Sequence, residues 1–516
     1  MGLLDVRKYV DNVLTLFLEN RQIRLYKERD LMPRLTDYLN GENDNRVMVL
    51  NGLRRTGKTV MMQQAIINHI GTDDTMYIQC QEDDKTNDIA DAILYSNKKY
   101  IFLDEATKVP DFINMASVFS DESAFMGHKI VMAGTDSLGF TFAKYDELFD
   151  RMHEIHTTYI PFSEYFNLTG KDLFEYMKYG GTLSDENYFY NEDTLEEYTN
   201  SAIIDNILHT YEHWDRGKHK IDLYPAKTAG DIRSLVNYYV RDENKRFLAE
   251  SIEKFEASEF HSPAEMFEKQ ARLKKTLPEM YKDVHIPDTE PLRDKKLAAE
   301  WQSVLQIKDN YPFEITEDLI TEIRENLIKL DVLTCVKNDS NKYLYYFTQP
   351  GMRYCHIKAA IDTLIQNEKV QKEYSEADID AVAGKIKENI EGRLLEDIVL
   401  LDLKKRFSSN QDIQIIKFSQ GTTEYDVAII NKGSKKSVAL EVKRSREMVE
   451  GQKRHLKNSD LQNDFERVSG TELVGKAVLY SGETKRDYDG IYYINSSSFL
   501  KNVDDNLNAL CPGFIK

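Results

Sequence analysis

The clearest chemical pattern in the sequence is an eight-residue segment, 52–59, that matches G-x-x-x-x-G-K-[ST] in full. Its residues are Gly52, Leu53, Arg54, Arg55, Thr56, Gly57, Lys58 and Thr59. Glycines let such a loop curl so that successive backbone N–H groups point at phosphate oxygens, and a following helix adds its partial positive charge. We expect Lys58 to contact the terminal phosphates and the Thr59 hydroxyl to hold Mg²⁺. The segment therefore predicts a nucleoside-triphosphate site with ATP and Mg²⁺ as cofactors.

Two carboxylates follow an apolar run at 100–103 and supply the second half of this site. The run predicts a buried strand, and ligands bind at the carboxyl ends of strands in doubly wound sheets. We expect Asp104 to hold the metal through water and Glu105 to orient or deprotonate the attacking water. The alternative is a strand end that only begins a loop.

A third apolar run, 130–133, is followed by Gly-Thr-Asp-Ser. Thr135 is placed to contact the γ-phosphate, against the alternative of a polar turn. Arg55 and Arg151 are candidates for neutralising charge in the transition state, either within one chain or on a neighbouring subunit. The alternative for each arginine is an ordinary surface position.

Near the C-terminus, three residues have the types and spacing of a metal-dependent phosphodiesterase site. Asp426 and Glu441 lie on two short apolar runs separated by the length of a hairpin, and Lys443 shares a strand face with Glu441. The two carboxylates would hold Mg²⁺, the lysine would position or deprotonate water, and Glu396 on the preceding helix would complete the metal shell. The alternative is a set of solvent-facing strand residues.

The charge of the chain limits its partners. Lys and Arg number 68 and Asp and Glu 87, for a net charge of −19. This excludes a protein whose whole surface coats nucleic acid. The segment 432–457 reverses the sign, with nine basic and three acidic residues, which suits contact with DNA phosphates. A solvated basic loop is the alternative.

The surrounding sequence predicts a multidomain α/β protein. Strand-like runs alternate with helical segments between 47 and 133, which is typical of a parallel doubly wound sheet. A helix beginning at Thr316 and two strands, 333–337 and 343–347, indicate a winged helix. A charged helical segment, 366–389, links to the last domain, which begins with a helix at 393–407. The predicted domains are 1–165 (P-loop ATPase with N-terminal helices), 166–312 (helical), 313–365 (winged-helix-like) and 390–516 (nuclease-like).

The predicted recognition helix of this winged helix is acidic. DNA phosphates would repel it, so we expect it to contact protein. Its charged residues are Glu317, Asp318, Glu322 and Glu325 against Arg324 and Lys329.

The location of the protein is expected to be the cytoplasm. No apolar run approaches the roughly 20 residues of a membrane helix, and charged residues interrupt the first 20 positions, so no signal peptide is expected. The four cysteines are far apart, which favours free thiols.

These motifs resemble those of prokaryotic AAA-class ATPases that carry a C-terminal domain of restriction-endonuclease-like, PD-(D/E)xK-type fold. The resemblance implies ATP binding and a nuclease-like fold that retains Asp426, Glu441 and Lys443, without implying cleavage. It rests on segments 51–59, 100–105, 133–137 with Arg151 and 161–165, and on 424–430, 439–445 and 476–484.

Two functions follow as hypotheses. The first is Mg²⁺-dependent ATP binding and hydrolysis coupled to a C-terminal domain that binds or cuts DNA. The second is a nucleotide-switched interaction protein whose C-terminal domain binds a protein partner, or a second copy of the chain, without cleaving nucleic acid.

Overall fold

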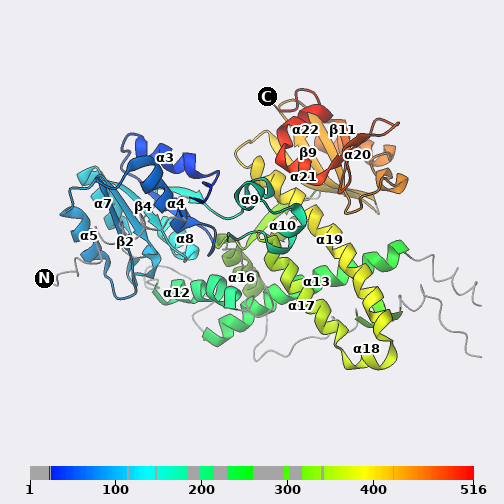
Figure 1. Ribbon diagram of the computed structural model, residues 1–516, viewed down its shortest axis with the longest axis horizontal. Helices are drawn as coiled ribbons and strands as arrows, with labels where there is room; N and C mark the ends of the chain where they lie inside the picture. The colour runs from blue at the N-terminus through cyan, green and yellow to red at the C-terminus, as the bar shows by residue number, and fades with distance from the viewer. Residues whose placement is uncertain are drawn as a thin grey trace, which may run out of the picture.

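A five-stranded parallel sheet lies at the centre of the N-terminal part of the computed structural model (Figure 1). Its strand order is β2-β3-β4-β1-β5. The strands are β1 Val47–Asn51, β2 Thr75–Gln79, β3 Tyr100–Asp104, β4 Lys129–Ala133 and β5 Met152–His156. The structure describes Ile23 and residues 25–112, 116–145, 148–183, 197–213, 229–259, 296–301, 316–338, 342–421 and 423–515.

Apolar residues on both faces explain why β1 to β4 are strands of a buried parallel sheet. Alternate side chains enter two cores: Met48 and Leu50 pack beneath α3 and α4, whereas Val47 and Val49 pack on the opposite face. The expectation of a parallel sheet is confirmed, while β5 was not predicted because its sequence is half polar and it lies at the edge. The covering helices are α3 Met32–Asn40, α4 Lys58–Ala65 with a π-helical extension Ile66–Ile70, α5 Thr86–Leu94, α7 Ser117–Met126 and α8 Ser137–Tyr145.

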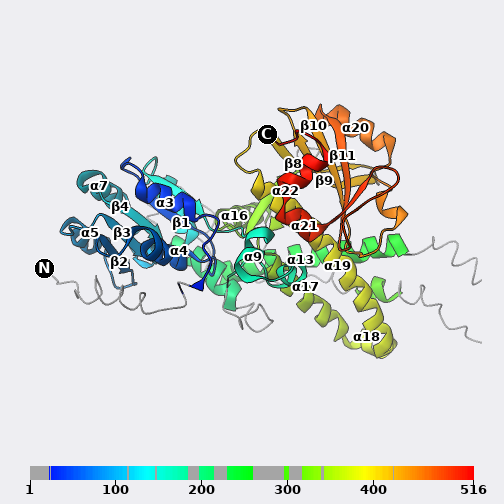
Figure 2. The same cartoon turned by 45° about the horizontal axis from the view of Figure 1, so that its top comes forward.

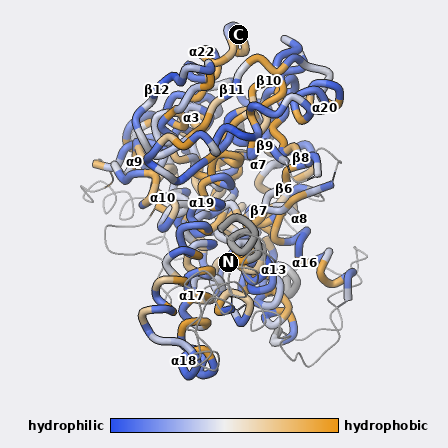
Figure 3. The backbone as a smooth tube through the Cα atoms, turned by 90° about the vertical axis from the view of Figure 1, so that its right-hand side faces the viewer, coloured by the Kyte–Doolittle hydropathy of each residue, from blue (hydrophilic) through white to orange (hydrophobic). Residues whose placement is uncertain are grey.

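The middle of the chain is helical and includes the expected helix and hairpin. The Thr316 side chain accepts a hydrogen bond from the Leu319 N–H and caps the helix, and the two strands pair antiparallel. Most of the polar segment 269–296 lies outside the described residues. The elements are α9 Phe162–Thr169, α10 Leu173–Tyr179, a π-helical turn Asn200–Ile204, α12 Asp205–His213, α13 Ala229–Glu259, α16 Glu317–Lys329, β6 Leu333–Lys337, β7 Tyr343–Phe347 and α17 Pro350–Ile365. Hydrophobic and hydrophilic residues both occur along α17 (Figure 3), and its first six residues, 350–355, are all buried.

One expectation about the chain before the last domain is wrong. A short helix, α18 Glu368–Glu373, is followed by a single helix, α19 Glu376–Arg406, where the sequence indicated a linker and a separate helix from 393. Gly392 lies inside α19 with open space where a side chain would be. A solvent-facing glycine costs a helix only about 1 kcal/mol, and burial of Ile386, Ile390 and Leu394 on either side maintains it.

The C-terminal domain holds a separate six-stranded sheet of order β12-β13-β11-β10-β9-β8 (Figure 2). The β8–β9 and β9–β10 pairs are antiparallel and β10–β11 is parallel. Its elements are β8 Ile413–Gln420, β9 Thr423–Asn431, β10 Lys436–Val442, a 3₁₀ turn Glu450–Lys453, α20 Ser459–Ser469, β11 Glu472–Tyr480, β12 Lys485–Arg486, β13 Tyr492–Asn495, α21 Ser496–Lys501 and α22 Val503–Leu510. Among the described residues, no helix combines the length and apolarity needed to cross a bilayer.

Candidate functional site

The loop between β1 and α4 has the backbone form that the sequence motif predicts. Gly52 has φ +143°, and a Cβ atom there would lie 2.2 Å from the Thr157 Oγ1, so only glycine fits. The Lys58 Nζ donates hydrogen bonds to the carbonyls of Gly52 (2.7 Å) and Leu53 (2.8 Å). Burial lowers the pKa of Lys58 to about 8, against the raising effect of Glu105 and Asp104. Two backbone carbonyls of the loop therefore hold the Lys58 ammonium in place.

Two threonines after β5 form the wall behind the loop. The hydroxyls of Thr56 and Thr157 share a hydrogen bond of 2.7 Å, and the Leu53 N–H donates to the Thr158 Oγ1 at 2.9 Å. The local sequence gives no signal for Thr157 and Thr158, because only the pairing of β5 with β1 brings them to the loop.

The two carboxylates after β3 lie beside the predicted partners. The Thr59 hydroxyl donates to the Asp104 Oδ2 at 2.9 Å, and the Tyr77 hydroxyl donates to the same oxygen at 2.7 Å. Burial raises the pKa of Asp104, partly offset by the hydrogen bond from Tyr77. The Thr135 hydroxyl, at the end of β4, donates to the Glu105 Oε2 at 3.1 Å. Three neighbouring strands thus bring Thr59, Asp104, Glu105 and Thr135 together.

A pocket of about 400 Å³ opens in front of these residues. The predicted residues Gly52, Leu53, Thr56 and Asp104 are buried and do not line this pocket. Val60, Lys108 and Leu183 line the pocket and were missed, because no local pattern marks them. The lining residues are Arg54, Arg55, Gly57, Lys58, Thr59, Val60, Glu105, Lys108, Thr135 and Leu183.

The two candidate arginines lie at opposite ends of the sheet. Arg55 lines the pocket, whereas Arg151 precedes β5, where its carbonyl accepts from the Val47 N–H at the start of β1. Its guanidinium contacts Asp121 at 3.0 Å. The strands are parallel, so this edge lies away from the loop at their carboxyl ends. The expectation that Arg151 acts within the same chain is wrong, and its role on a neighbouring subunit stays a prediction.

The C-terminal carboxylates and lysine also meet. The Lys443 Nζ lies 3.0 Å from the Asp426 Oδ2 and 2.9 Å from the Glu441 Oε2. Asp426 and Glu441 are buried, and the antiparallel pairing of Val427 with Leu440 places them on adjacent strands. Burial acts to raise the pKa of both carboxyls. For Asp426 the lysines Lys443 and Lys417 and the hydrogen bond from the Val442 N–H together outweigh burial, and the pKa falls below its ordinary value. For Glu441, burial and the neighbouring Asp426 keep the pKa raised.

Three further residues border this cluster. Glu396, predicted as an additional ligand, lies on α19 and approaches the Nζ of Lys417 at 3.6 Å. The His455 Nδ1 lies 3.5 Å from the Glu441 Oε1. Lys417 and His455 were missed because their distance in sequence from the motif gives no signal. Carboxylate oxygens are the ligands that Mg²⁺ prefers, but among the described residues those of Glu396, Asp426 and Glu441 do not all lie within 4.8 Å of one another.

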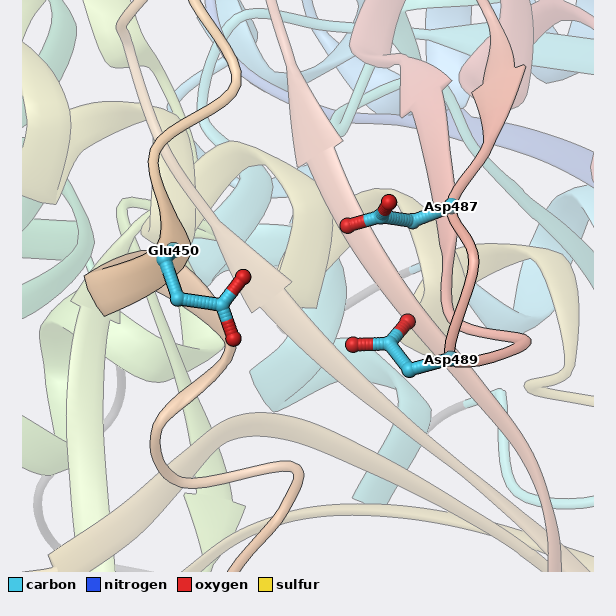
Figure 4. A group of neighbouring side chains, drawn as sticks. All are labelled: Glu450, Asp487 and Asp489. Atoms are coloured by element: carbon cyan, nitrogen blue, oxygen red, sulfur yellow. The ribbon is translucent and has the colours of Figure 1, made fainter.

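Acidic partners balance part of the basic segment 432–457. The buried Lys453 Nζ lies 2.8 Å from Glu450 and 2.7 Å from Asp489, and it also contacts Asp487. The three carboxylates face one another (Figure 4), and the Lys453 ammonium supplies the positive charge between them. Lys457 also pairs with Asp489, at 2.7 Å. The net positive charge counted from the sequence of 432–457 is therefore larger than the unpaired positive charge that could contact a phosphate backbone.

The comparisons with known proteins identify the N-terminal domain. Residues 44–166 match the family model of an AAA domain. No curated protein matches the chain. Among solved structures, the Orc1 protein of Aeropyrum pernix in complex with DNA aligns with 67% of this chain and 95% of its own at 13% identity. The TM-score of this alignment is 0.24. Residues 44–166, which include the phosphate-binding loop, are therefore similar to AAA domains.

Proposed function

We propose that the P-loop domain binds ATP with Mg²⁺ and hydrolyses it. The observation that carries the proposal is the convergence on one pocket of a buried lysine, a hydroxyl–carboxylate pair (Thr59 and Asp104, 2.9 Å) and a second carboxylate, Glu105. A hydroxyl and a carboxylate are hard oxygen ligands, which fit Mg²⁺. When bound, Mg²⁺ would neutralise charge on the β- and γ-phosphate oxygens.

The protein residues divide the remaining work. Lys58 contacts the terminal phosphates, and Arg55 at the pocket wall faces charge that develops during transfer. The Glu105 carboxylate accepts a proton from the attacking water. At the same time the water oxygen bonds to the γ-phosphorus, and the bond from this phosphorus to ADP breaks. The Thr135 hydroxyl donates a hydrogen bond to the Glu105 carboxylate, and at the pocket wall it would contact the γ-phosphate.

The test uses labelled ATP and the full chain. Lys58→Ala should lose saturable uptake, and Glu105→Gln should bind ATP but release phosphate at least about 100-fold more slowly, the usual range for general-base loss. Two exposed residues supply matched controls, Lys85→Ala and Glu82→Gln, which should behave as the parent does. Hydrolysis by Glu105→Gln at the parental rate would contradict its role, and absence of uptake by the parent would contradict the function.

We also propose that the C-terminal domain is nuclease-like and acts on DNA. The buried carboxylates of Asp426 and Glu441, each within 3.0 Å of the ammonium of the half-buried Lys443, support this proposal. The two carboxylates would hold a divalent ion that activates water, and Lys443 would position the water or the scissile phosphate.

Cleavage of plasmid and branched DNA with Mg²⁺ or Mn²⁺ tests this second function. Nicking should disappear in Asp426→Asn and Glu441→Gln and persist in Glu447→Gln, an exposed control. Metal binding with no cleavage and no salt-sensitive DNA binding would instead favour the alternative, a nucleotide-switched protein whose C-terminal domain binds a protein partner or a second copy of the chain.

A further inference from the structure

Three consecutive carbonyls of the phosphate-binding loop are held from outside the loop. In a trans peptide, the C=O and the next N–H point in opposite directions. Fixing these carbonyls outward therefore aims the following N–H groups toward the phosphate side of the loop. The three bonds are from the Tyr198 hydroxyl to the Arg54 carbonyl (3.1 Å), from the Leu183 N–H to the Arg55 carbonyl (2.7 Å) and from the Arg29 Nη1 to the Thr56 carbonyl (2.5 Å).

One buried side chain connects two of these donors. The Gln349 Nε2 donates to the Tyr198 Oη at 3.0 Å and to the Gly181 carbonyl at 3.1 Å. Gly181 lies two residues before Leu183, so its position sets that of the Leu183 N–H. A Cβ atom on Gly181 would lie 2.6 Å from the Gln349 Cβ, which shows how closely the two segments pack. Gln349 has no exposed surface.

Gln349 lies far from the nucleotide-binding motifs in sequence. It immediately precedes α17, after the hairpin β6–β7, and both it and Tyr198 are outside the 44–166 segment that matches the AAA domain. The Gln349 amide thus links the start of α17 to the loop through Tyr198 and segment 181–183, and the Gly351 N–H adds a hydrogen bond to the Gly180 carbonyl at 3.1 Å. A rotation of α17 relative to the loop would break these bonds and release the Arg54 and Arg55 peptide planes.

We propose that Gln349 is a positioning residue of the nucleotide site, which holds the loop N–H groups in their phosphate-binding orientation through Tyr198 and segment 181–183. The proposal rests on the ATP function above. Gln349 does not touch the reacting atoms, so it acts on the preorganisation of the loop and hence on nucleotide affinity. Loss of its hydrogen bonds should raise KM more than it lowers kcat.

The experiment compares ATP hydrolysis by the full-length parent with that of two variants. Gln349→Met keeps the side-chain volume and removes the amide, and Tyr198→Phe removes one oxygen. We expect each to raise KM for ATP about three- to tenfold, the effect of one or two net hydrogen bonds, with kcat within about twofold. Both substitutions act on one chain of hydrogen bonds. The double variant should therefore raise KM no more than about the more severe of the two single variants does. Gln371→Met on α18, an exposed glutamine, is the control.

The possible outcomes are distinguishable. If the parent hydrolyses ATP and KM is unchanged in both single variants, the proposal is wrong. Fully additive effects would also overturn it. A purely structural role would instead lower the urea midpoint of the nucleotide-free protein without moving KM of the folded fraction. If Gln349→Met fails to fold, Tyr198→Phe decides alone. Failure of the parent itself to bind ATP would contradict the proposed function.

Discussion

The hydroxyl of Tyr159 donates a hydrogen bond to the carboxylate of Asp402, a residue 243 positions further along the chain. Tyr159 follows the threonines that back the phosphate-binding loop, and Asp402 lies on α19. The second oxygen of Asp402 accepts from the Phe162 N–H at 3.0 Å. Glu396, at the edge of the C-terminal carboxylate cluster, is on the same helix. The wall of the P-loop is therefore bonded directly to the helix that borders the second candidate site.

The stability of this contact should depend on pH. Burial raises the pKa of Asp402 to about 7, although the hydrogen bonds from Tyr159 and Phe162 act to lower it. An unfolded aspartate titrates near about 3.9, so between these values the folded chain binds the extra proton. The free energy of unfolding should fall as pH rises from about 4 to about 7, by an amount on the order of 1–4 kcal/mol.

Denaturant titrations at several pH values measure this slope. Asp402→Asn should flatten it, whereas Asp380→Asn, an exposed position on the same helix, should retain it. An equal slope in Asp402→Asn and the parent would show that another group carries the pH dependence.

Nucleotide affinity should weaken in alkali. The pKa of Lys58 is lowered to about 8 by burial, so the free protein loses this ammonium as pH rises through that value, while a bound triphosphate favours the charged form. The Kd for ATP should be nearly constant below about pH 7.5 and rise toward about tenfold per pH unit above about pH 8.5. Lys58→Ala should bind weakly without this slope, and Lys85→Ala should keep it. A flat parental profile to about pH 10 would argue against the lowered pKa.

Removing one partner of the buried Arg29–Glu164 pair should be costly. The guanidinium donates to both Glu164 oxygens and to the carbonyls of Thr56 and Thr157. Arg29→Met leaves a buried carboxylate unpaired and should lower the free energy of unfolding by about 3–5 kcal/mol. Adding Glu164→Gln should recover part of that loss, and exposed Arg34→Met should cost less than about 1 kcal/mol. A loss as small as that of the control would contradict the importance of the pair.

If DNA binds through segment 432–457, the salt dependence of binding should respond more to loss of an exposed cation than to loss of a cation that is already paired. Each phosphate contact contributes about −0.9 to the slope of log K against log salt. Exposed Arg446→Gln should reduce the slope by about one. Lys457→Gln should change it less, because Asp489 already neutralises Lys457 at 2.7 Å. Equal changes for the two variants would mean that the Lys457 ion pair opens on DNA.

Local sequence was sufficient for elements with strong local signals. The hairpin strands 333–337 and 343–347 have the expected bounds, because apolar β-formers end there at polar or turn residues. The strand predicted at 100–103 continues by one residue, to Asp104. The continuity of α19 was missed because Gly392 resembles a helix end. The helix tolerates Gly392 because this residue faces open space. The periodicity of the sequence does not show this.

The sequence by itself determined the identity of the chemical groups: a lysine and a hydroxyl at the start of a helix, carboxylates at strand ends, and a second carboxylate–lysine set. Short motifs reveal these groups, because the geometry of a helix or a strand fixes how residues a few positions apart are placed relative to one another. Only the tertiary structure decided which distant groups orient them. Strand pairing and close packing bring together segments whose separation along the chain leaves no periodic signal. The residues that bond to the phosphate-binding loop in this way are Arg29, Thr157, Leu183 and Tyr198, and Gln349 acts on the loop through Tyr198.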